Sequence, residues 1–273
     1  MKLHTYKTMP PHEIHHEFKN NSWRGFFYAT LIFMAITAFI AAPKGGAENT
    51  ELAVVPGAVT LFFASLGALR FRQYRLQNNW ILRVTPSGLL VNLRSHHHYF
   101  FPDHTPCVLE LDREEIAAIG KTQVSRTIPT SHSEAREHHS YIDVYLHPGD
   151  LRDLQHAIRQ ERRIALEYPN RKIAPHFTVQ VVEPDCIRLL WEWIEPRENA
   201  ALALFSKSYP LAPDRKEKRP KWDDLDAEGR RHFIRELWEG GNVKDTVRLI
   251  QAEHNLTPRQ ARGWIREHLE PMG

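Results

Sequence analysis

The sequence lacks the short motifs that mark common enzyme classes. It has no G-x-x-x-x-G-K-[ST] loop for nucleotide phosphates, no G-x-G-x-x-G dinucleotide fingerprint and no G-x-S-x-G nucleophile turn. It also has no C-x-x-C pair. These absences favour a non-catalytic protein, so we assign no catalytic residue and no cofactor.

The sequence also has few cysteines and a small net charge. Cys107 and Cys186 are the only cysteines among 273 residues, too few to indicate a disulfide framework, so we expect a reducing compartment. The formal net charge is only +3, which by itself gives no argument for nucleic acid binding.

Charge is absent altogether from two apolar stretches, residues 25–42 and 52–69. Each is 18 residues long, or about 27 Å as a helix, close to the thickness of a bilayer's hydrocarbon core. We therefore predict a transmembrane helical hairpin over residues 25–70. No ionisable side chain lies inside either stretch, which argues for an anchor over a transporter. A stripe of small residues suits packing within the hairpin or pairing with another subunit in a homo-oligomer: Gly57, Ala64, Gly67 and Ala68.

Basic residues flank the hairpin on both sides, while the connecting loop carries one lysine and two glutamates. The positive-inside rule then places both termini in the cytoplasm of a bacterium, with the hairpin in the inner membrane. Residues 1–24 are expected to be a cytoplasmic tail. Four arginines are expected to face anionic head groups at the membrane surface: Arg24, Arg70, Arg72 and Arg75.

Residues 78–208 predict a cytoplasmic α+β domain of mainly antiparallel strands. "WILRVT" and "LLVNLR" flank the turn "PSG", "CVLEL" and "YIDVYL" indicate further strands, and "EEIAAIGKTQVSRTI" allows a helix or a strand. "GDLRDLQHAIRQERRIAL" has the apolar spacing of a helix, with Asp150 as its N-cap. "PRENAALALFSK" predicts a second helix.

The apolar hairpin followed by "WILRVTPSGLLVNLR" resembles bacterial membrane-anchored proteins with a pleckstrin-homology-like domain. The residues that carry the resemblance are the "T-x-x-G-L" turn of Thr85, Gly88 and Leu89, and the later "REEIAAI" of Arg113 to Ile119. The segment from Gly149 to Lys172 departs from that pattern and suggests an inserted helix. The resemblance implies a strongly bent sheet and a binding role.

Histidine is abundant, and one segment, "SHHHYFFPDHTPC", contains ligand types suited to a transition metal. Its candidate ligands are His96, His98, His104 and Cys107. Their spacing fits no standard zinc motif, so we favour a solvated loop. "HEIHH" matches H-E-x-x-H from His12 to His16, but it lies in a polar tail, which favours coincidence.

Residues 209–222 are rich in proline and basic charge and are expected to be a linker. Residues 223–273 predict three short helices, the third capped by Thr257 with Pro258 in its first turn. This module resembles the helical hairpin of the ribosomal stalk protein's C-terminal domain, and also a helix-turn-helix. Arg259, Arg262 and Arg266 share one side of the last helix. Acidic residues outnumber basic ones from Asp223 onward, so we favour a protein partner over DNA.

The sequence therefore predicts an α+β membrane protein, an inner-membrane anchored adaptor that recruits a protein partner. Two alternatives stay open at this point. One is a membrane-bound transcriptional regulator with a C-terminal helix-turn-helix, and the other is a metal-dependent enzyme that uses the histidine-rich loops.

Overall fold

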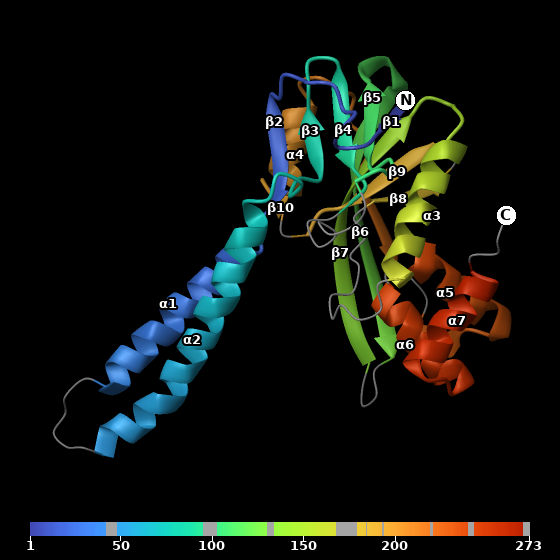
Figure 1. Cartoon of the computed structure of the whole chain (residues 1–273). Helices are drawn as coiled ribbons and strands as arrows, with labels where there is room; N and C mark the ends of the chain where they lie inside the picture. The colour runs from blue at the N-terminus through green and yellow to red at the C-terminus, as the bar shows by residue number, and fades with distance from the viewer. Residues whose placement is uncertain are drawn as a thin grey trace.

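The computed structural model describes residues 1–41, 48–94, 103–129, 134–167, 179–183, 185–192, 194–218, 221–239 and 243–269. These residues form an α+β fold with a body of two sheets, a helical hairpin that projects from it and a group of short helices on the other side (Figure 1).

The first sheet has the strand order β1-β5-β4-β3-β2-β10, and every neighbouring pair is antiparallel. Its strands are β1 (Lys2–His4), β2 (His16–Asn20), β3 (Leu82–Val84), β4 (Gly88–Asn92), β5 (Val108–Asp112) and β10 (Ile194–Glu195). The residues expected to be a cytoplasmic tail thus supply two strands of this sheet.

The second sheet has the order β11-β6-β7-β9-β8. Its strands are β6 (Ile116–Pro129), β7 (Glu134–Leu146), β8 (Val179–Glu183), β9 (Cys186–Leu190) and β11 (Arg215–Lys218). β6 resolves the ambiguous "EEIAAIGKTQVSRTI" as a strand after a short 3₁₀ turn, Arg113–Glu115. β11 pairs with β6 in parallel, so part of the expected linker belongs to the sheet.

The predicted turn "PSG" connects β3 to β4 and explains why glycine is needed there. The Gly88 amide donates to Thr85 Oγ1 at 3.1 Å, and the Thr85 amide donates to the Gly88 carbonyl at 3.0 Å. A Cβ atom on Gly88 would lie 1.9 Å from the carbonyl oxygen of Leu111 on β5. Any side chain at this position would therefore push β4 and β5 apart.

One hydrophobic core fills the space between the two sheets and extends under the helices α3 (Arg152–Glu167) and α4 (Glu198–Phe205). Phe18 of β2 packs edge-on against Trp191, with ring centroids 5.2 Å apart, and against Phe205 of α4 at 5.4 Å. Phe18 thus connects the first sheet to the segment that follows β9, the last described strand before Trp191. The two sheets therefore share one core and form a single body.

Helix α3 places a carboxylate inside this body. Leu154 and Ile158 are buried at helical spacing, and Glu161 continues the same face with 1% of its side chain exposed. Glu161 accepts hydrogen bonds from Arg94 Nε at 2.7 Å and from Arg94 Nη2 at 2.8 Å. Burial opposes the charge on Arg94, but these contacts outweigh burial and raise the pKa of its guanidinium.

A second buried ionic network joins four strands of the other sheet. Arg188 of β9 donates to both oxygens of Asp143 on β7, at 2.8 and 2.9 Å. It also donates to Glu217 of β11 at 2.9 Å, and Thr122 of β6 donates to Asp143 at 2.7 Å. β11 is therefore fixed by ionic contacts as well as by its backbone pairing.

The two apolar stretches form the helices α1 (Trp23–Ala41) and α2 (Glu48–Tyr74), which run antiparallel as a hairpin away from the body (Figure 1). Within the described residues, neither these nor any other helix combines the length and apolar content needed to span a bilayer. The predicted transmembrane pair is wrong, and so are the membrane fold class and the integral, inner-membrane placement of the chain.

The two helices contain more than the uncharged stretches. Residues of low hydropathy dilute the apolar part of α2: Pro56, Gly57, Thr60, Ser65 and Gly67. Charged residues that flank the stretches also belong to the helices, Arg24 to α1 and Arg70 and Arg72 to α2. The membrane-surface role expected for Arg24, Arg70, Arg72 and Arg75 depended on the anchor and is withdrawn with it.

Three C-terminal helices form a small unit with a core of its own: α5 (Ala227–Glu239), α6 (Val243–His254) and α7 (Pro258–His268). Thr257 Oγ1 accepts the Gln260 amide, which confirms the predicted cap of α7. Asn255 adopts a left-handed conformation, with φ of 50°, at the end of α6. Trp222 and Ile164 pack on this core, so the unit rests against the C-terminal half of α3.

Candidate functional site

The seam between α1 and α2 is built from small and hydroxylated residues. Thr37 and Thr60 lie within hydrogen-bond distance across it, at 3.3 Å, and Phe33 stacks on Phe63 with ring centroids 5.2 Å apart. Two members of the predicted small-residue stripe face α1 across this seam. A Cβ atom on Gly67 would lie 3.6 Å from Phe26 Cβ, and one on Gly57 would lie 3.9 Å from Thr37 Cγ2, both ordinary van der Waals distances.

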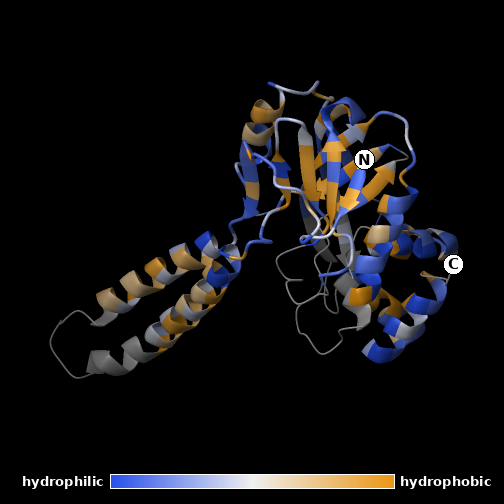
Figure 2. Cartoon of the chain, turned by 45° about the horizontal axis from the view of Figure 1, so that its top comes forward, coloured by the Kyte–Doolittle hydropathy of each residue, from blue (hydrophilic) through white to orange (hydrophobic). Residues whose placement is uncertain are grey.

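The bulky apolar side chains of the hairpin point outward. Fourteen large hydrophobic side chains are exposed among the described residues, and all but Ile14 and Leu211 belong to α1 or α2. The exposed fraction reaches 80% at Phe39, 70% at Leu61 and 69% at Val55. In Figure 2, hydrophobic residues recur along both helices of the hairpin, whereas hydrophilic residues are more frequent along the C-terminal helices. This outer surface, hereafter the hairpin surface, carries twelve of the fourteen exposed large hydrophobic side chains among the described residues.

Aromatic and basic residues form a neck where the hairpin meets the body. Trp23 packs edge-on against Phe71, with centroids 5.2 Å apart, and lies 5.9 Å from Tyr74. Arg24 forms an ion pair with Glu195 of β10. Arg70 donates to Gln73 at 3.2 Å and lies over the ring of Phe26, while Arg75 lies over Phe71. Three of the arginines expected at a membrane surface, Arg24, Arg70 and Arg75, therefore lie among the aromatic side chains of this neck.

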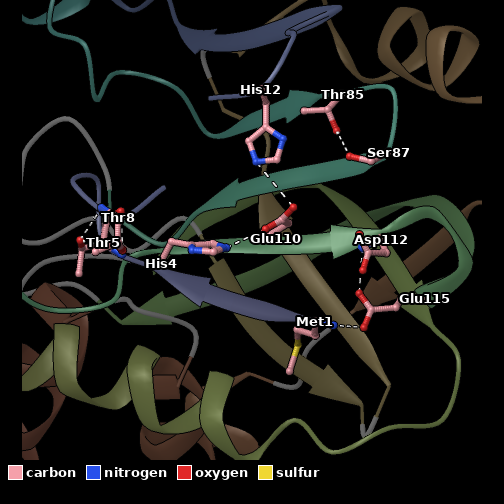
Figure 3. Close-up of polar contacts among 10 residues, drawn as sticks. All are labelled: Met1, His4, Thr5, Thr8, His12, Thr85, Ser87, Glu110, Asp112 and Glu115. Atoms are coloured by element: carbon pink, nitrogen blue, oxygen red, sulfur yellow. Dashed lines mark hydrogen bonds and ion pairs between the residues drawn. The ribbon is translucent and has the colours of Figure 1, made fainter. Parts of the chain in front are cut away.

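The N-terminal segment covers one end of the first sheet through polar contacts (Figure 3). His4 and His12 both point toward Glu110 of β5, with Nε2 to carboxylate oxygen distances of 2.7 Å and 3.6 Å. The N-terminal amine pairs with Glu115. The segment from His12 to His15 is not helical, and His16 begins β2, so H-E-x-x-H has no helix on which to align its imidazoles.

The predicted metal ligands are not brought together in the described part of the chain. His96 and His98 lie outside the described residues, and His104 is exposed. Cys107 is fully buried, and this burial raises the pKa of its thiol to about 11, so the thiol is neutral near pH 7. Among the described residues no group of three histidine, cysteine or acidic side chains is arranged to hold a metal ion.

The C-terminal unit presents the three predicted arginines on α7 to different degrees. Arg259 and Arg266 are exposed, and Arg262 is half-buried. Trp264 lies about 200° around α7 from Arg262, on another side of the helix, and stacks on His268 at 4.3 Å and on His254 at 5.1 Å. The face that carries the arginines suits a carboxylate-bearing protein and a phosphate backbone equally, so its geometry does not choose between the adaptor and the DNA-binding regulator.

The ionic networks of the body were missed in the sequence. Glu161 had a detectable signal, because it lies three residues after Ile158 and seven after Leu154, on the apolar face of a predicted helix. A carboxylate at such a position indicates a buried partner. The partner, Arg94, lies 67 residues away, and no local pattern connects the two.

Comparison with known proteins adds no relative: no protein family, no curated protein and no solved structure matches this chain. The resemblances to the pleckstrin-homology-like domain and to the ribosomal stalk hairpin therefore stay predictions.

Proposed function

We propose that the chain is a non-catalytic adaptor that assembles with a second copy of itself through the hairpin surface. Each copy then presents its C-terminal helical unit to a protein partner. The observation that carries the proposal is the concentration of exposed apolar side chains on the projecting hairpin. Large exposed apolar patches on a folded protein commonly mark surfaces that are covered by a partner.

The size of the hairpin surface supports a stable interface. Twelve large side chains contribute to it. If each has about 150 Å² of surface, the lower end of the aromatic range, and roughly half of it is exposed, the hairpin presents about 900 Å² per copy. A standard protein interface buries about 800 Å² on each side. Two hairpins packed side by side would form a four-helix bundle, the usual arrangement for helices of this length.

The absence of charge favours a second copy over an unrelated partner. Recognition of a different protein usually relies on complementary charges, which fix orientation and exclude wrong partners. The apolar parts of the two helices, residues 25–41 of α1 and 52–69 of α2, carry none. In a two-fold interface the same patch meets itself, so an uncharged surface meets no repulsion. If the hairpins lie antiparallel, the arginine-bearing necks of the two copies are also kept apart.

Two isoleucines offer a matched test, because 41% of Ile36 and 42% of Ile14 are exposed. Ile36 lies on α1 and Ile14 lies outside the hairpin. Sedimentation velocity of the full chain in detergent-free buffer is expected to show an assembly for the wild type and for Ile14→Glu. Ile36→Glu is expected to shift the chain to the monomer, because it places a charge in a dry interface. Equal masses for both variants would overturn the proposal.

A further inference from the structure

A cavity of about 750 Å³ lies at the neck, between the end of α2, the strands β2 and β3, and the N-terminal segment. This volume falls in the range typical of small-molecule sites, about 300–1,000 Å³. It is far larger than a single ion needs. Neither the predicted adaptor role nor the hairpin surface accounts for it.

Positive charge is in excess along its walls. Lys19, Arg75 and Arg83 line the cavity together with a single opposing carboxylate on β2, Glu17. Arg83 donates to Glu17 Oε2 from Nε at 2.6 Å, and Lys19 Nζ lies 2.6 Å from Glu17 Oε1. Three cations against one carboxylate leave an excess of two positive charges.

The other charged residues of the lining are already paired. Arg94 lies at the inner wall, where Glu161 neutralises it, and Asp103 forms an ion pair with Lys7 at 3.4 Å. Arg75 differs from them, since its side chain lies over the ring of Phe71 and contacts no carboxylate within the described residues. Arg75 is therefore the lining cation best placed to receive an anion.

Apolar side chains complete the lining of the cavity. Met9 and Leu76 line it beside Trp80, of which only 3% is exposed. The Arg83 guanidinium lies over the Trp80 ring, 4.2 Å from its centroid, and is held by Glu17 at the same time. A guanidinium fixed in this way presents its other face to a flat ligand, since arginine stacks on planar groups as well as donating hydrogen bonds.

We infer that this cavity, hereafter the neck pocket, binds a small phosphate monoester with a flat organic group. The doubly charged phosphate matches the excess of two positive charges, and arginine donors suit phosphate oxygens. The flat group stacks on the face of the Arg83 guanidinium that is turned away from Trp80 and fills the remaining volume. The inference does not rest on self-assembly, because the described residues that line the pocket all belong to one chain.

Two neighbouring arginines of the neck allow a controlled test with phenyl phosphate as the probe. Arg75 lines the pocket, whereas Arg72, one turn earlier on α2, does not. Calorimetric titration of the full chain is expected to show saturable binding of phenyl phosphate. The doubly charged probe should bind more tightly than benzenesulfonate, which has one charge, and than inorganic phosphate, which lacks the ring. Arg75→Gln is expected to weaken binding about tenfold, the effect of losing one charge-assisted hydrogen bond, and Arg72→Gln to leave it unchanged.

The inference is overturned if binding does not saturate by about 10 mM phenyl phosphate, the weakest affinity that we expect of a specific site. It is also overturned if Arg75→Gln and Arg72→Gln weaken binding equally, or if phenyl phosphate and benzenesulfonate bind with equal affinity. Ile36→Glu separates this inference from self-assembly. We expect it to retain phenyl phosphate binding whether or not the hairpin joins two copies.

Discussion

Replacing Glu161 with glutamine tests how much the buried ion pair contributes to the stability of the body. Glutamine has nearly the same shape but no charge, so the change leaves Arg94 charged in a site where 1% of its side chain is exposed. The Glu161 carboxylate accepts two hydrogen bonds from Arg94 and one from the Thr105 hydroxyl at 3.0 Å, and the change also replaces one of its two acceptor oxygens by a donor group. Breaking a buried pair from one side typically costs about 3–5 kcal/mol.

The expected loss is measurable as a fall in the melting temperature. Each kcal/mol corresponds to about 2–4 °C for a domain of 150–250 residues, so Glu161→Gln should lower the melting temperature of the body by roughly 6–20 °C. Tryptophan fluorescence on heating is a suitable measurement. Glu253→Gln is a matched control, because the pair of Glu253 with Arg230 is about one-third exposed, and such pairs contribute less than about 1 kcal/mol.

A double variant distinguishes a lost charge partner from lost packing. Arg94→Met with Glu161→Leu removes both charges and keeps similar volume, and replacements of this kind are often neutral or stabilising. We expect the double variant to melt well above Glu161→Gln. The reasoning is refuted if Glu161→Gln melts within about 2 °C of the wild type, a shift smaller than one kcal/mol produces, or if the double variant is the less stable.

Three further predictions concern single residues of the body. Gly88→Ala should lower the free energy of unfolding by several kcal/mol, at the upper end of single-residue effects. The reason is that the Cβ atom of alanine would lie 1.9 Å from the Leu111 carbonyl oxygen. Urea unfolding measures the loss, with Ser87→Ala as the control. Hydrogen bonds from Arg152 lower the pKa of the Asp150 carboxyl to about 2. The stabilisation that this carboxylate gives to α3 is therefore present above pH 3.8, the ordinary pKa, and is lost as pH falls toward 2. A midpoint near 3.8 in an NMR titration of the carboxyl would disprove this prediction. The Cys107 thiol should resist alkylation at pH 8 in the folded chain, because burial raises its pKa to about 11, whereas rapid labelling would show that the site is open.

Local patterns were sufficient for elements whose apolar residues repeat with a clear period. The β3–β4 hairpin, the strand within "YIDVYL", α3 and the three C-terminal helices all appear where periodicity, turn residues and caps predict them. Thr257 is the clearest case, since a hydroxyl before Pro258 caps α7 through its own side chain.

The missed strands have a different physical origin. β1, β2 and β11 are short and polar, and each is fixed by backbone pairing with a strand that is distant in the sequence, as when Lys216 of β11 pairs with Gln123 of β6. Edge strands such as β11 need no alternating apolar face, so the sequence carries no local signal for them. The environment of the apolar stretches of α1 and α2 could not be predicted from the sequence, because a hydrophobic run alone does not show whether lipid or protein covers it.

Covering of the hairpin surface by a second copy of the chain can be measured directly. The mass of the chain is determined by light scattering coupled to size exclusion, over a range of concentrations and without detergent. We expect a discrete mass of at least twice the 31.9 kDa of one chain, unchanged when lipid vesicles are added. A monomeric mass at every concentration, or recovery of the chain only with vesicles or detergent, would contradict it.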